Sequence, residues 1–167
     1  MLKSIEDVNE RDENGLTKLH IAAMYGHKDI VIKLLDKGAC INETDNGGLT
    51  ALHFAAGNGH TDQVSWLLEQ GANVDERDKS EQTPLHHAAS QGHNDILALL
   101  IRMGADDDAE DIHCLTAFDH AKRGGQEKTV ALMVRQRWSQ GDKHKGIVEF
   151  AGHHSFEEMV HFELWDL

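Results

Sequence analysis

Residues 83–89 read Thr-Pro-Leu-His-His-Ala-Ala, and variants of this heptapeptide occur three more times in the chain. The other copies begin at residues 17, 50 and 116, so each lies 33 residues from the next, with no insertion or deletion. An aspartate five residues before each threonine and a glycine nine residues after it keep the same register. Self-similarity at a fixed period of this size is typical of repeat proteins. The sequence therefore predicts four consecutive repeats, at 12–44, 45–77, 78–110 and 111–137.

Each repeat has the pattern of two short helices. Thr17 is a good N-cap, because its hydroxyl can accept from a backbone N–H that has no partner in the first turn. Leu19 and Ala22 then lie on one face, and Gly26 can adopt the left-handed conformation that ends a helix. A second helix is expected from near Asp29. One such pair cannot cover its own apolar face, so we expect the pairs to stack into a solenoid.

The Thr-Pro-Leu-His-x-Ala motif at a period of 33 residues resembles the ankyrin repeat, over roughly residues 8–137. The resemblance implies an all-α repeat solenoid, in which β-hairpin fingers join the helix pairs and a concave groove binds a partner. Two features depart from the family pattern. Glu81 and Cys114 replace the turn glycines present as Gly15 and Gly48, so we expect altered turns in the third and fourth fingers. The fourth repeat has Asp119 for the motif histidine, which fits a terminal repeat.

The two ends lie outside the four full repeats. Residues 1–11 are interpreted as part of a finger, so either the first repeat ends the stack or the sequence belongs to a longer array. Residues 138–167 are interpreted as a C-terminal extension. Ser155 to Glu158 resemble a capping box, and apolar residues follow at helical spacing, which predicts a helix at 155–166. This helix either covers the end of the stack or docks a partner.

Charge and composition restrict the function. Lys and Arg total 16 against 29 Asp and Glu, giving a net charge of −13. Such a field disfavours nucleic acid and acidic membrane surfaces and favours a protein partner with a basic segment. No apolar run reaches the roughly 18 residues of a membrane helix, and the first residues do not resemble a signal peptide. We therefore expect a cytoplasmic or nuclear protein that is a monomer by itself.

The 13 histidines do not predict a metal site. Most recur in register, so equivalent ones are separated by a stacking step of roughly 10 Å, too far to share one ion. His154 and His161, with Glu157 and Glu158 between them, are the one alternative cluster. Cys40 and Cys114 lie about two stacking steps apart and cannot form a disulfide. No catalytic residue, metal or cofactor is predicted, and the chain is not expected to be an enzyme.

We therefore predict a protein–protein interaction module that acts as scaffold, adaptor or regulator. The alternative is the non-catalytic regulatory portion of a larger enzyme. The acidic run 106–111 is either a solvated finger or a contact for basic side chains, and Asn42 loosely resembles the asparagine that is hydroxylated in some relatives. In ankyrin relatives partners touch the finger tips and the solvent face of the first helices. Transferred to this sequence, those positions are Glu13, Asn14, Leu16, Met24, Tyr25, Asn46, Leu49, Asn58, Lys79, Gln82, Gln91, Ile112 and His113.

Overall fold

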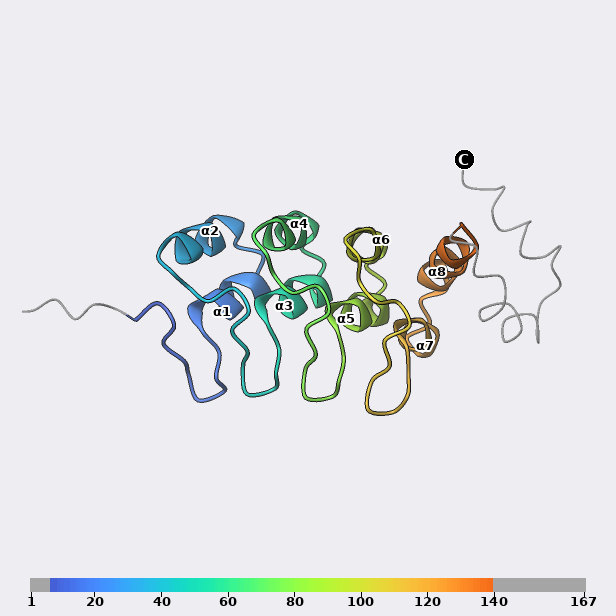
Figure 1. Cartoon of the computed structure of the whole chain (residues 1–167), viewed down its shortest axis with the longest axis horizontal. Helices are drawn as coiled ribbons and strands as arrows, with labels where there is room; N and C mark the ends of the chain where they lie inside the picture. Colours follow the sequence, from blue (N-terminus) through green and yellow to red (C-terminus); the bar gives the residue numbers. More distant parts are fainter. Residues whose placement is uncertain (1–6, 140–167) are drawn as a thin grey trace, which may run out of the picture. The chain divides into compact units, whose positions relative to one another are not determined.

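A computed structural model describes residues 7–139 of the chain, and in this range it contains eight α-helices and no strand (Figure 1). Among these residues, 7–129 belong to one compact unit and 130–139 to a second. The helix at 155–166 expected from the sequence lies outside the described residues, as do His154 and His161. The helices are α1 (Lys18–Met24), α2 (Lys28–Asp36), α3 (Ala51–Gly57), α4 (Thr61–Glu69), α5 (Pro84–Gln91), α6 (Asn94–Arg102), α7 (Ala117–Arg123) and α8 (Glu127–Ser139).

Within the first unit the helices stack in chain order. The first helices α1, α3, α5 and α7 contact one another in sequence, and α1, α3 and α5 also contact the second helices α2, α4 and α6 of their own pairs. Figure 1 shows the first helices as one row, with α2, α4 and α6 in a second layer above it. The predicted helical repeat solenoid is confirmed.

The motif threonines occupy equivalent places at the start of α1, α3, α5 and α7. Thr17 has an extended backbone and is the N-cap of α1, and the histidine three residues later returns a side-chain bond to the cap. Thr50 and Thr83 form the same capping box with their histidines. In α7 the carboxylate of Asp119 takes the place of the imidazole and accepts from the Thr116 backbone N–H at 3.0 Å. The regular row of caps that the period predicts is therefore present.

The core runs along the stack as a column of small and aliphatic side chains. Leu19, Leu52 and Leu85 are almost completely buried, and Phe118 occupies the same position in α7. Two alanines in each of the first three repeats lie on the same face and are also buried. Because alanine is small, neighbouring helices can approach closely and bury the leucines between them.

The fingers are held by a repeated aspartate turn. In the second finger, Oδ1 of Asp45 accepts from the backbone N–H groups of Gly47 and Leu49, both at 2.8 Å. Successive fingers are also joined by a backbone bond, as from Asn46 to the carbonyl of Asn14 at 2.9 Å. Across the described residues these segments contain turns and no strand, so the β-hairpin geometry expected for the fingers is not observed.

The third and fourth fingers keep the turn of the first two, and the expectation that they differ is wrong. Gly15 and Gly48 have φ of 77° and 83°, and Glu81 and Cys114 adopt φ of 60° and 56° at the equivalent positions. The N–H of Glu81 donates to the Asp78 carbonyl at 2.9 Å, the bond that Gly48 makes in the second finger. The bonds around each aspartate therefore impose a left-handed backbone on side chains that disfavour it.

Candidate functional site

We use "finger surface" for the turns of the four fingers together with the solvent-facing side of α1, α3, α5 and α7. All thirteen residues predicted to bind a partner lie on these segments, and none of them is buried. The partly buried ones are Leu16, Met24, Leu49 and Gln82. The exposed ones are Glu13, Asn14, Tyr25, Asn46, Asn58, Lys79, Gln91, Ile112 and His113.

Three of these residues also support the fold. Asn46 donates from its side chain to the Glu13 carbonyl at 3.0 Å and so joins the first two fingers. The Asn58 side-chain amide donates to the Phe54 carbonyl at the end of its own helix. The Gln82 side-chain amide donates to the Asp111 carboxylate at 3.4 Å. Substituting these side chains would change both the surface and its support, so they are poor probes of binding.

The apolar part of the finger surface is concentrated in the first repeat. Tyr25 has 65% of its surface exposed, and Leu16 and Met24 of the same repeat are partly exposed. Ile21, one turn before Tyr25 on α1, is 42% exposed and was not among the predicted residues. Ile21 directly follows the motif histidine, and the repeat pattern alone does not indicate whether a side chain at this position is exposed.

A second feature that the sequence did not predict is a pair of histidine–aspartate contacts in the third and fourth repeats. Nε2 of His87 lies 3.0 Å from Oδ2 of Asp78, and Nε2 of His120 lies 2.8 Å from Oδ2 of Asp111. Each pair ties a first helix to the finger before it. The sequence clue was the nine-residue separation of each aspartate and histidine, which recurs in these two repeats only.

Asp111 also accounts for one end of the acidic run at 106–111. Burial would raise the pKa of this carboxyl, but hydrogen bonds from His120 and from the backbone N–H groups of Leu115 and His113 outweigh it and hold the pKa below its usual range. Asp106 accepts from the Asp108 backbone N–H at 3.0 Å. Some carboxylates of the run therefore form hydrogen bonds within the protein, and the run is not a uniform patch of solvated carboxylates.

The motif histidines are structural. Nδ1 of His20 accepts from the Thr17 backbone N–H at 3.0 Å, and its Nε2 lies 2.8 Å from the Glu43 carbonyl oxygen of the next finger. His53 and His86 make the same two kinds of contact. Burial lowers the pKa of all three, that of His53 to about 4. These imidazoles are fixed as neutral connectors between repeats.

In the part of the chain that the structure describes, no group of three His, Cys, Asp or Glu side chains could hold a metal ion. Cys40 and Cys114 are both exposed and free, as the stacking distance predicted. No helix among residues 7–139 is long and apolar enough to cross a membrane.

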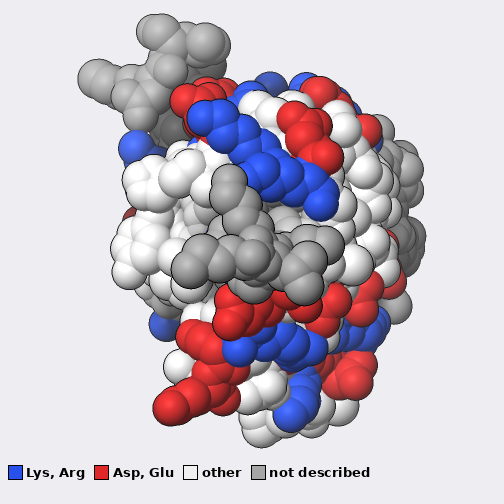
Figure 2. Space-filling model, turned by 90° about the vertical axis from the view of Figure 1, so that its left-hand side faces the viewer, with Lys and Arg blue, Asp and Glu red and all other residues white. Residues whose placement is uncertain are grey.

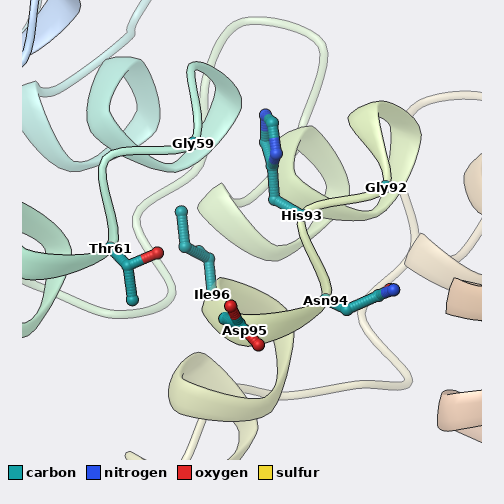
Figure 3. Close-up of a pocket in the computed structure, with 7 residues that line it drawn as sticks. All are labelled: Gly59, Thr61, Gly92, His93, Asn94, Asp95 and Ile96. Atoms are coloured by element: carbon teal, nitrogen blue, oxygen red, sulfur yellow. The ribbon is translucent and has the colours of Figure 1, made fainter.

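A hollow lies away from the fingers, where the turn before α4 meets the start of α6 (Figure 3). It has a volume of about 330 Å³. Figure 3 shows Thr61 and Ile96 directed into the space between the two turns and Asn94 directed away from it. Nε2 of His93 lies 3.1 Å from the Gly57 carbonyl oxygen, and the Thr129 hydroxyl donates to Oδ1 of Asn94 at 2.7 Å. These two polar side chains are therefore already engaged in contacts that stabilise the fold.

Comparison with known proteins agrees with this geometry. The helix pairs, capped by Thr and His and stacked at a constant period, define a helical repeat protein. Residues 1–78 match a family model described as ankyrin repeats (3 copies), and residues 58–101 match one described as ankyrin repeats (many copies). Together the two matches extend over residues 1–101 of 167. The chain belongs to the ankyrin-repeat family.

A curated relative is an ankyrin and IPT/TIG repeat-containing protein of Schizosaccharomyces pombe. It is 58% identical to this chain over 33 residues, which is 20% of this chain and 3% of the relative. The stretch has the length of a single repeat, so the similarity concerns the repeat unit. Ankyrin repeats are generally modules of protein–protein interaction, and this is the class of function that the family supports.

Proposed function

We propose that this protein binds a partner protein through its finger surface and works as a scaffold, adaptor or regulator rather than as a catalyst. Four repeats at 12–44, 45–77, 78–110 and 111–137 would present this surface, with the partner lying in the groove between finger tips and first helices. The proposal rests on one observation above all, the exposed apolar cluster of Ile21 and Tyr25 at the first repeat.

Exposed isoleucine and tyrosine side chains that lie together are typical of surfaces that a partner covers. Aromatic side chains are frequent anchors of protein interfaces, where they fill a pocket and exclude water. Tyr25 is the C-cap of α1, so its backbone is held by the helix while 65% of the residue's surface is exposed. Because the backbone is already ordered, a partner that covers the ring needs to order only the side chain, which favours binding.

Charge supports a partner with a basic segment. The first finger presents exposed carboxylates at Asp12 and Glu13, close in sequence to the apolar cluster. A net charge of −13 would speed the approach of a cationic partner, chiefly at low salt. A binding segment that combines an apolar anchor with Lys or Arg would complement the first repeat. The protein would work in the cytoplasm or the nucleus and be a monomer when alone.

The test identifies partners first and then perturbs the surface. The full chain is used as bait, bound proteins are identified by mass spectrometry, and the affinity of one purified partner is measured by calorimetry. Tyr25→Ala and Leu49→Ala should each weaken that affinity by roughly ten-fold, the usual effect of removing an interface anchor. Both variants should unfold at the same denaturant concentration as the natural protein.

Gln70→Ala is the matched control, because Gln70 is exposed at the end of α4 and lies off the finger surface. It should leave the affinity unchanged. If Tyr25→Ala, Leu49→Ala and Gln70→Ala all bind the partner equally well, the partner is bound elsewhere and the proposal is wrong.

A further inference from the structure

A row of aromatic rings runs along the finger surface at the residue that follows each motif histidine. In the second, third and fourth repeats this residue is Phe54, His87 and His120, and each of the three is partly buried. Each ring lies edge-on to the motif histidine of the repeat before it, with centroids 5.8 Å apart for Phe54 and 5.4 Å apart for the other two. Because α3, α5 and α7 lie side by side, the rings form a series with one member per repeat, which we call the ring row (Figure 1).

The exposure of the ring row does not depend on the ends of the sequence. His87 belongs to the third repeat, whose first helix α5 contacts both α3 and α7. Its side chain nevertheless keeps 28% of its surface exposed, and that of His120 keeps 18%. A partner can therefore reach the imidazole of His87 with both neighbouring repeats already in place.

Each histidine of the ring row has one ring nitrogen that the fold leaves without a hydrogen bond. Nε2 of His87 and Nε2 of His120 face a finger carboxylate at 3.0 and 2.8 Å. A carboxylate only accepts, so Nε2 carries the proton, and the Nδ1 lone pair of the neutral ring is an acceptor. Among residues 7–139 no hydrogen bond engages either Nδ1. In the same range the one fully buried side-chain nitrogen or oxygen without a partner is Oε1 of Gln63, so both Nδ1 atoms have access to solvent.

The second repeat shows that a finger does not need the imidazole. Phe54 lies nine residues after Asp45, the same separation as between Asp78 and His87. Although phenylalanine offers no hydrogen bond, Oδ1 of Asp45 keeps both bonds of the aspartate turn, each at 2.8 Å. Oδ1 of Asp78 makes the equivalent two bonds at 2.8 and 2.9 Å. The turn is complete without a histidine, so the imidazoles of the ring row are available for recognition of a partner.

We propose that the ring row binds an extended segment of the partner protein, with an apolar side chain over Phe54 and hydrogen-bond donors at Nδ1 of His87 and of His120. The donors would be amide, hydroxyl or cationic side chains. The ring row is part of the finger surface, so this choice of partner segment rests on the proposed function. An edge-on contact and a bond to the finger aspartate already hold each imidazole, which lowers the entropic cost of binding.

The spacing of the ring row favours one conformation of that segment. Packed helices lie roughly 10 Å apart, so consecutive rings are separated by about this distance. A polyproline II helix has three residues per turn and advances about 3.1 Å per residue, so every third side chain points the same way after about 9.3 Å. A β-strand repeats a face every second residue, which gives about 7 Å or about 13 Å. The polyproline II conformation therefore matches one side chain to each repeat.

Charge on the finger side favours donors over carboxylates. Figure 2 views the protein from the end at which α1 and α2 lie, with the fingers at the bottom, where Asp and Glu side chains gather with Lys and Arg among them. Each imidazole of the ring row also lies against a carboxylate of its own finger. A Glu or Asp of the partner would be repelled by these groups, whereas a donor would meet the lone pair of Nδ1.

The experiment titrates the full chain with three synthetic proline-rich peptides of about ten residues and measures binding by calorimetry. Each peptide has a leucine and, three and six positions later, two copies of a test residue, which is Gln, Met or Glu. The Gln peptide should bind roughly ten-fold more tightly than the Met peptide, because two hydrogen bonds distinguish them. The Glu peptide should bind least tightly of the three.

The variants exchange the rings of the row. The double variant His87→Phe with His120→Phe should bind the Gln and Met peptides equally, and Phe54 shows that the fold accepts phenylalanine at this position. Phe54→His is the reverse change, and it should bind a peptide with Gln in place of the leucine more tightly than the natural chain does. His113→Phe is the matched control, because it removes an exposed imidazole of the fourth finger outside the ring row and should keep the preference for Gln.

Three results would overturn the assignment of the ring row. They are no binding of any peptide, a Gln peptide that binds no more tightly than the other two, and a preference for Gln that the double variant retains. If Tyr25→Ala still weakens the natural partner in any of these cases, the finger surface remains the binding site and only the role of the ring row is wrong. If Tyr25→Ala and Leu49→Ala leave the affinity of the natural partner unchanged, the proposed function itself is wrong.

Discussion

The imidazole Nε2 of His53 lies 3.2 Å from the backbone carbonyl oxygen of Gln82, 29 residues further along the chain. On the other side of the ring, Nδ1 accepts from the Thr50 backbone N–H at 3.1 Å. A backbone N–H can only donate, so Nδ1 carries no proton and Nε2–H donates to Gln82. One neutral tautomer of a buried ring thus caps its own helix and holds the next finger.

Acid should therefore loosen the stack. Protonation of His53 places a hydrogen where Nδ1 accepts from Thr50, and burial lowers the pKa of the ring from 6.5 to about 4. Because the folded pKa lies below the unfolded one, the stabilisation is complete above pH 6.5 and is lost as pH falls towards 4. Between pH 7 and pH 5 the free energy of unfolding should fall by about 2 kcal/mol from His53 alone, as urea titrations at the two pH values would show.

Burial also lowers the pKa values of His20 and His86, so these two residues likewise make the free energy of unfolding fall as the pH falls. The low pKa of Asp111 contributes only below about pH 4, outside this window. His53→Gln should flatten the dependence of the free energy of unfolding on pH. A free energy of unfolding that stays constant from pH 7 to pH 5 in the natural protein would contradict this account.

Much of this arrangement follows from the sequence. A threonine, a leucine and a histidine repeated every 33 residues require equivalent surroundings, and the Thr17 cap and the buried Leu19 show that they have them. The turn at Glu81 does not follow from local preference, because a left-handed backbone disfavours glutamate. Its aspartate turn overrides that preference, and only the hydrogen bonds around Asp78 reveal this.

The binding surface follows from the sequence to a smaller extent. Its location on the fingers and first helices could be transferred from the family, and every transferred residue is indeed accessible. The exposure of Ile21 and Ile30 could not be transferred from the family in this way, because the equivalent positions in later repeats are covered by a neighbouring repeat. Periodicity assigns one environment to all repeats, whereas exposure depends on a repeat's place in the stack.

The glycine between the two helices of a pair should tolerate no side chain, for a reason beyond its backbone. Gly26 has φ of 72°, and a Cβ placed there would lie 2.7 Å from Cε1 of the His60 ring. Gly26→Ala must therefore both strain the backbone and displace a ring that bonds the Met24 carbonyl. We expect a loss of about 2–4 kcal/mol, as the sum of left-handed strain and a broken, partly buried hydrogen bond, measured by urea denaturation.

Gly38→Ala separates the two contributions. Gly38 has φ of 89°, but nothing lies within 4 Å of the position of its Cβ. It should lose about 1–2 kcal/mol from strain alone. Equal losses in the two alanine variants would show that the His60 ring yields without cost.

The left-handed residues of the third and fourth fingers offer stabilising substitutions. Glu81→Gly and Cys114→Gly should each raise the free energy of unfolding by about 0.5–1 kcal/mol, because glycine adopts positive φ without steric strain. Glu81 also pairs with Arg77 at 3.3 Å, an exposed contact worth little. Glu81→Ala removes that contact and keeps the strain, so it should not stabilise. Urea denaturation of the three variants checks this, and destabilisation by both glycines would mean that the turns are not strained.

The leucine column gives the sharpest test of the stack itself. Leu52 and Leu85 are 1% and 0% exposed, each inside a repeat with neighbours on both sides. Replacing either by alanine removes buried methyl groups and leaves a cavity that rigid helices cannot close, which should cost about 2–5 kcal/mol. Ile112→Ala, at a side chain that is 57% exposed, should cost less than about 0.5 kcal/mol. Urea denaturation of the three variants would measure the difference, and if Leu52→Ala and Ile112→Ala proved equally stable, the leucines could not be the contact that holds neighbouring repeats together.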